Sequence, residues 1–227
     1  MSGPPSRRSD LVQGPPDPDL DLKGFPTDAL TPEAVIYRAH AAGYGPWWYD
    51  NTPGDSGGRF NLTDADQGTC YVADTPEAAL RERFGKTLAR LRWIDAETAS
   101  RAELSLLTVS RERTAGNVST PEAAGYGITS ELTDAVPYDI SQEWAALFDG
   151  EGFDGIHYTA RFSAGGAANA WALFGPYGEH PEGEDPATVP GIEACRSVGI
   201  EVREPAPHPD DVTIIRPDPL PDPATDT

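Results

Sequence analysis

Residues 69–88 read TCYVADTPEAALRERFGKTL, a strand pattern followed at once by the start of a helix. The first five of these residues are mostly β-branched or aromatic, which favours an extended strand. Thr75 is a typical N-cap and Pro76 suits the first turn of a helix. Apolar side chains then recur at helical spacing. The stretch therefore predicts a strand over 69–73 and a helix from Thr75 to about Leu88.

The rest of the chain shows short strand patterns and one more helix. Strands are expected at 35–39, 59–62, 104–109, 155–158 and 170–174, a loop over the glycine-rich residues 43–58, and a helix capped by Ser141 that runs to Phe148. Many short strands with a few helices indicate an α+β fold.

Proline is concentrated at the two ends of the chain. Of 23 prolines, 13 lie in residues 1–30 and 203–227. Segments of this composition bury too little apolar area to offset their chain entropy, so we expect both to be disordered or extended tails. The folded domain is expected to span residues 31–202.

The chain is strongly acidic. It has 37 acidic and 17 basic side chains and a net charge of −20, of which −14 falls on residues 31–202. Such a surface repels phosphate backbones and anionic membranes, so we expect no nucleic-acid partner and no membrane partner. An anionic ligand would need a local group of positive charges.

Targeting and metal-binding patterns are not visible in the sequence. No apolar run approaches the length that spans a bilayer, and no apolar stretch follows the arginines near the N-terminus. Cys70 and Cys195 lack the spacing of a zinc site or a disulfide framework, and the four histidines lack ligand spacing. We therefore expect a cytoplasmic protein without a metal.

Four side chains in the first 82 residues suggest chemistry. Arg38 follows a strand pattern and Arg59 follows two glycines, and guanidinium forks of this kind bind oxyanions such as diphosphates. Tyr71 lies on the strand before the helix that carries Glu82. A glutamate facing a sugar carbon stabilises an oxocarbenium-like transition state. Each residue also has an ordinary structural explanation, because arginines form ion pairs, strand tyrosines pack, and glutamates complement helix dipoles.

The order and spacing of these motifs resemble the RES-domain family, which is named for an Arg, a Glu and a Ser. Its members are NAD-degrading toxins of bacterial toxin–antitoxin pairs. The matching stretches are residues 36–40, 58–61, 71–82, 153–158 and 169–174. The resemblance implies a fold similar to mono-ADP-ribosyltransferases, in which two small, mostly antiparallel sheets with a few flanking helices form an NAD cleft.

The resemblance also implies roles for individual residues. Arg38 and Arg59 would hold the pyrophosphate of NAD or the neighbouring ribose, and Tyr71 would stack on the nicotinamide ring. Glu82 would be the catalytic carboxylate, and Arg38 would also be a catalytic residue. NAD would be the substrate, and a cognate antitoxin protein would be the partner.

The family's serine is the point where the sequence departs from the pattern. Its ungapped position is Ala160. Thr159 would supply a catalytic hydroxyl in its place if the strand carries a bulge, and Ser163 lies just beyond. A second departure is an acidic insert at about residues 92–139.

The sequence thus predicts an enzyme that cleaves the nicotinamide–ribose bond of NAD and transfers ADP-ribose to water or phosphate. Two alternatives stay open. The same fold could transfer ADP-ribose to a macromolecule, or it could be a catalytically dead module that binds NAD or a partner protein.

Overall fold

The computed structural model of the chain describes residues 12–134, 136–163, 168–182 and 186–204. It contains the strand and helix expected from residues 69–88. Strand β4 (Gln67–Ala73) leads into helix α1 (Pro76–Leu91), and the Thr75 side chain accepts a hydrogen bond of 3.1 Å from the Ala78 amide. The helix thus begins where its N-cap predicts and runs three residues farther than expected.

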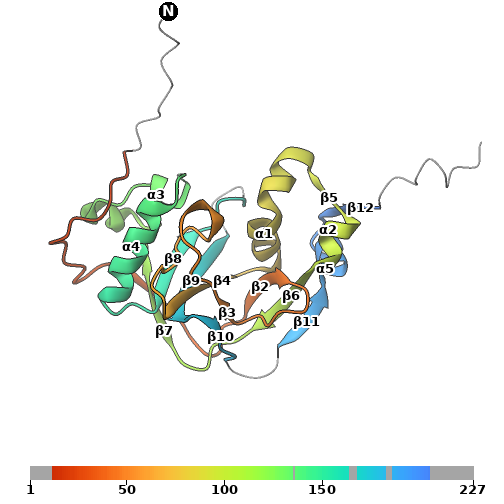
Figure 1. The fold of residues 1–227 in the computed structure, drawn as a ribbon, viewed down its shortest axis with the longest axis horizontal. Coiled ribbons are helices and arrows are strands. Elements are labelled where there is room, and N and C mark those ends of the chain that lie inside the picture. Colours follow the sequence, from red (N-terminus) through yellow and green to blue (C-terminus); the bar gives the residue numbers. More distant parts are fainter. Residues whose placement is uncertain (1–11, 135, 164–167, 183–185, 205–227) are drawn as a thin grey trace, which may run out of the picture.

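Eight strands form the main sheet, which Figure 1 shows with helices packed along it. Their order is β1-β7-β8-β9-β4-β2-β6-β11. Besides β4, the strands are β1 (Thr27–Leu30), β2 (Ile36–Ala41), β6 (Ala102–Leu107), β7 (Arg113–Asn117), β8 (Gly155–Thr159), β9 (Asn169–Pro176) and β11 (Ala187–Pro190). Neighbouring strands are antiparallel except β7 and β8. The expected α+β class is confirmed.

Strands β2 and β4 are paired over a much shorter length than the other neighbouring strands of this sheet. These two strands share a single residue pair, Tyr37 with Ala73, whereas β4 pairs with β9 from Gln67 to Ala73. The two small sheets that the resemblance implied are therefore joined into one sheet by one pair of residues.

Short elements complete the fold. They are β3 (Trp48–Tyr49) paired with β10 (Gly178–Glu179), β5 (Trp93–Asp95) paired with β12 (Glu201–Arg203), the 3₁₀ turns η1 (Gly54–Ser56) and η2 (Pro121–Tyr126), and helices α2 (Ala96–Ser100), α3 (Glu131–Asp134), α4 (Asp139–Gly150) and α5 (Gly191–Ser197).

Two local predictions were wrong. Residues 59–62 form a turn followed by irregular chain and not a strand. The Asn61 side-chain amide donates to Asp50 Oδ2 at 2.6 Å and to the Thr52 carbonyl at 3.0 Å, which draws the chain back on itself. Helix α4 begins before Ser141, whose hydroxyl donates instead to the Leu132 carbonyl at 2.9 Å.

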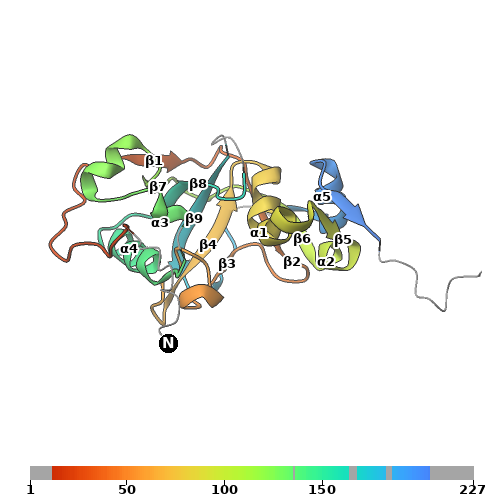
Figure 2. The same ribbon diagram turned by 90° about the horizontal axis from the view of Figure 1, so that it is seen from above.

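The two faces of the sheet have separate apolar cores. On one face, α1 packs against β2 and β4 while α4 packs against β8 (Figures 1 and 2). Leu80 of α1 and Phe148 of α4 join Ile156 of β8 in one buried cluster. A smaller cluster on the opposite face includes Trp47 and Cys70. Because strand side chains alternate between faces, each strand residue belongs to one of these two environments.

The folded domain begins earlier than the predicted boundary at residue 31. Phe25 is only 5% exposed and packs edge-on against Tyr126, Phe148 and Phe153, and β1 pairs with β7. The proline content of the segment concealed the apolar area that Leu22 and Phe25 bury. The ends of the expected tails, residues 1–11 and 205–227, lie outside the described residues.

The segment 92–139, expected as an insert, contributes to the main sheet. It supplies β6, which lies between β2 and β11, and β7, which lies between β1 and β8. Within the described part of the chain, no helix is long and apolar enough to cross a membrane.

We expect Phe25→Ala to lower the free energy of unfolding by about 3–5 kcal/mol, because truncating a buried aromatic ring leaves a cavity among three other rings. The control is Val12→Ala, since Val12 is 78% exposed and its truncation should change stability by less than about 0.5 kcal/mol. Denaturant unfolding measures both. Equal effects would contradict the packing of residues 12–30 onto the domain.

Candidate active site

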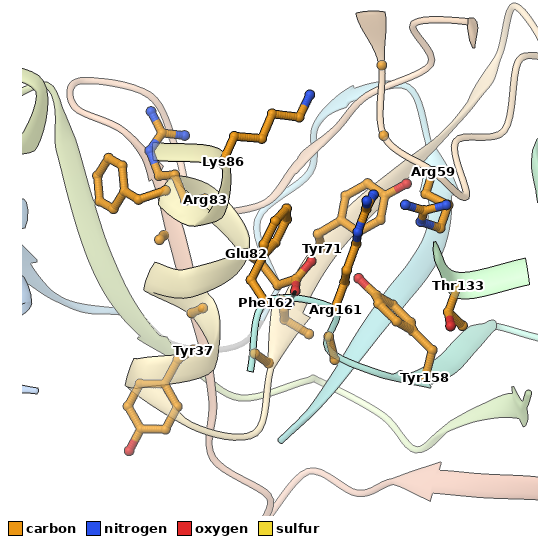
Figure 3. A pocket seen from close by; sticks show the side chains of 18 of the residues that line it. Tyr37, Arg59, Tyr71, Glu82, Arg83, Lys86, Thr133, Tyr158, Arg161 and Phe162 are labelled. Atoms are coloured by element: carbon orange, nitrogen blue, oxygen red, sulfur yellow. Dashed lines mark hydrogen bonds between the residues drawn. The ribbon is translucent and has the colours of Figure 1, made fainter. Parts of the chain in front are cut away.

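A cavity of about 390 Å³ lies where β2 and β4 diverge, beside helix α1. Tyr37 and Ala39 come from β2, and Tyr71 and Ala73 come from β4. The other side chains used below come from α1 and from loops before β4, before α4 and after β8: Arg59, Glu82, Tyr138, Arg161 and Phe162, together with Tyr158 of β8. Figure 3 shows Glu82, Tyr71, Tyr158 and Arg161 directed toward the same space.

Tyr71 is held in place at both its ring and its hydroxyl. The hydroxyl donates to Asn61 Oδ1 at 2.9 Å and accepts from the Phe60 amide at 2.8 Å. The ring packs against Gly58, where an added Cβ would lie only 2.4 Å from it, so no larger residue fits there. Burial raises the pKa of Tyr71 well above its usual value, which keeps the phenol protonated at neutral pH.

Glu82 projects from α1 into the cavity and accepts a hydrogen bond of 3.3 Å from the Phe162 amide. Gly85, one turn later, allows this contact, because an added Cβ would lie 2.1 Å from the Phe162 ring. Burial raises the pKa of Glu82, although the Phe162 amide and the positive charges of Arg59 and Arg161 favour its ionised form. The carboxylate is thus partly desolvated and close to positive charge.

Three arginines line the cavity, namely Arg59, Arg83 and Arg161. Arg59 is only 9% exposed and its guanidinium carbon lies 4.5 Å from the centre of the Tyr138 ring, a cation–π contact. Arg161 is exposed, and Figure 3 shows its guanidinium group near that of Arg59. Burial lowers the pKa of Arg59, and the charge of Arg161 acts in the same direction. Because these like charges disfavour each other, an anion bound between them would be stabilised.

Arg38, predicted as a site residue, is not among the residues that line this cavity. Its Nη1 donates to the Pro46 carbonyl at 2.6 Å and lies 2.5 Å from Cys70 Sγ. The reason is strand alternation: Tyr37 and Ala39 face the cavity, so the residue between them faces the other side of the sheet. The other arginines that line the cavity beside Arg59 are Arg83 and Arg161.

Thr159 is also absent from this cavity. It lines a neighbouring cavity, and its amide donates to Ser119 Oγ at 2.8 Å. Ala160, at the family's serine position, is buried and contributes no polar group. The hydroxyl expected from Thr159 therefore does not lie beside Glu82.

Several residues of the cavity were not among the predicted site residues. Tyr158 belongs to the stretch that carried the resemblance, and Arg161 follows its strand by two residues, so both had a weak signal in the sequence. Tyr138 lies in the expected insert, where no pattern pointed to it. The structure brings together Arg59, Tyr71 and Glu82 of the predicted set.

Within the described ranges, no three His, Cys, Asp or Glu side chains lie close enough together to hold a metal ion. The cavity offers instead one carboxylate, three guanidinium groups and several aromatic rings, a set that suits a ligand with anionic and aromatic parts.

Comparison with known proteins gives two similarities. The family model of the RES domain matches residues 35–189. The fold is similar to a chain in the crystal structure of the M. tuberculosis MbcT-MbcA toxin-antitoxin complex, with a TM-score of 0.50 and 15% sequence identity over 74% of this chain and 90% of that chain. No curated protein matches significantly. Because the family model covers well over half of the sequence, the chain belongs to the RES domain family.

Proposed function

We propose that this protein cleaves the bond between nicotinamide and ribose in NAD, with Glu82 as the catalytic carboxylate. The observation that carries the proposal is that Glu82 shares one cavity with Arg59, Arg161 and Tyr71. Membership of the RES domain family supports NAD as the substrate.

The main requirement of the proposed reaction is a carboxylate held close to the ribose. The C1′–N bond breaks and its electron pair stays on the pyridinium nitrogen, so nicotinamide leaves as a neutral molecule without protonation. Positive charge develops on the ribose, where the ionised Glu82 stabilises it. Water or phosphate then forms the new C–O bond at C1′, and water loses a proton in doing so.

The other side chains would bind and orient NAD. Arg59 and Arg161 suit the diphosphate, since guanidinium groups bind phosphate oxygens bidentately. Tyr71 suits the nicotinamide ring, because its orientation is already set by Asn61 and the Phe60 amide.

The distribution of charge supports an anionic ligand at this place. Among the described residues that line the cavity, four are basic, namely Arg59, Arg83, Lys86 and Arg161, whereas Glu82 is the only acidic one. The chain has a net charge of −20, so the basic lining makes this cavity a favourable place for an anion.

A toxin role with a cognate antitoxin forms part of the proposal. It is supported by the family and by the fold similarity to a chain of a complex described as toxin–antitoxin. The acceptor would be water or phosphate, and product analysis with and without phosphate separates the two.

We expect Glu82→Gln to slow nicotinamide release from NAD by about a hundredfold or more, because an amide cannot stabilise the cationic ribose as a carboxylate does. Nicotinamide release from NAD by the purified protein is the measurement. Expression of the wild-type chain should arrest growth, and this variant should relieve the arrest.

The matched control is Glu77→Gln, which removes an exposed carboxylate from the same helix, where it pairs with Arg81. It should keep the wild-type rate. If Glu82→Gln released nicotinamide as fast as the control, the role of Glu82 would be wrong.

We expect the acid limb of the kcat/KM profile to lie above pH 4.5, the ordinary pKa of a glutamate. Burial raises the pKa of Glu82, so the ionised form needed for catalysis is lost at a higher pH as the solution is acidified.

Thermal unfolding checks the same shift independently. A raised pKa in the folded state means that ionised Glu82 costs stability, and this cost appears as pH rises through the folded pKa. Glu82→Gln should therefore be at least as stable as the wild type at neutral pH, and its advantage should vanish in acid. A variant destabilised at neutral pH would contradict this account.

We expect Arg161→Gln to raise KM for NAD by about tenfold, because a charge-assisted contact to the diphosphate is lost. Arg161 is exposed, so its replacement should leave the fold intact. Arg101→Gln, which removes an exposed arginine paired with Glu97, serves as the control. Steady-state kinetics with equal KM values for both variants would exclude Arg161 from the binding of NAD.

A further inference from the structure

A second cavity, of about 640 Å³, adjoins the one that holds Glu82. The two cavities share Arg161 and Thr133 in their linings, so the Arg161 guanidinium lies at the boundary between them. The wall of the second cavity comes from η2, α3 and the loops after β7 and β8.

The lining of this second cavity combines apolar and polar residues. Val118 and Ile128 are buried, and Ala124 of η2 is exposed. The polar residues are Asp134 and several that carry hydroxyl groups. An apolar surface with a few placed polar groups is the usual character of a small-molecule site.

We propose that the adenosine half of NAD binds in the second cavity. This inference rests on the proposed function, because it places the diphosphate at Arg161. In a dinucleotide the diphosphate joins the two nucleosides, so a nicotinamide riboside beside Glu82 and a diphosphate at Arg161 direct the adenosine into the adjoining cavity. The apolar lining residues suit the adenine ring, and the polar ones suit the ribose.

Asp134 gives this site a specificity. Its carboxylate accepts hydrogen bonds from ribose hydroxyl groups, as acidic residues do in other dinucleotide sites. The additional 2′-phosphate of NADP would place negative charge against the same carboxylate. The protein should therefore prefer NAD to NADP.

The experiment uses the full-length protein, calorimetry with ADP-ribose, and cleavage of nicotinamide mononucleotide, which has the scissile bond but no adenosine. Ala124→Trp should fill the second cavity and weaken ADP-ribose binding by about tenfold or more, while nicotinamide mononucleotide is cleaved at the wild-type rate. Glu122→Trp places the same side chain on the same short helix outside the cavity, and should change neither.

Asp134→Asn tests the site without filling it. It should reduce the preference for NAD over NADP by about tenfold, whereas Glu122→Gln, which removes a carboxylate outside the cavity, should leave the preference unchanged. If Ala124→Trp binds ADP-ribose as the wild type does, or if the wild type does not bind ADP-ribose, the adenosine site is wrong.

These outcomes are distinct from a failure of the proposed function. If the wild type released nicotinamide from neither NAD nor nicotinamide mononucleotide, the catalytic proposal would fail. Binding of ADP-ribose, and its loss in Ala124→Trp, would still decide where the adenosine lies.

Discussion

Strands β2 and β4 meet at one residue pair, Tyr37 with Ala73, and the candidate site depends on this geometry. A sheet paired along its whole length would leave no space between these strands. Because they diverge, side chains of both strands line a cavity beside α1. The helix follows β4 after only two residues, so its second turn lies over the gap and places Glu82 there.

The electrostatics of the cavity follow from burial in an acidic chain. Glu82 is partly desolvated, which favours its neutral form, while Arg59, Arg161 and the Phe162 amide favour its carboxylate. The same guanidinium groups would offset the charge of a diphosphate. A substrate that is cationic at its reacting ring and anionic at its diphosphate matches this arrangement, since each part meets the opposite charge.

Much of the fold and part of the site could be predicted from local patterns. The strand and helix of residues 67–91 follow from β-propensity and a Thr-Pro helix start, and the Tyr71 and Glu82 positions follow from them. The motif position of Arg38 predicted a place in the site, whereas strand alternation directs its side chain toward Pro46 and Cys70 on the other face of the sheet. Tyr138 could not be found, because its place above Arg59 depends on tertiary packing of a distant segment.

The central claim is tested most directly by a crystal structure of Glu82→Gln with NAD bound. The account predicts nicotinamide against Tyr71, C1′ of its ribose beside residue 82, and the diphosphate between Arg59 and Arg161. NAD bound outside this cavity, or bound there with its diphosphate away from both arginines, would contradict it.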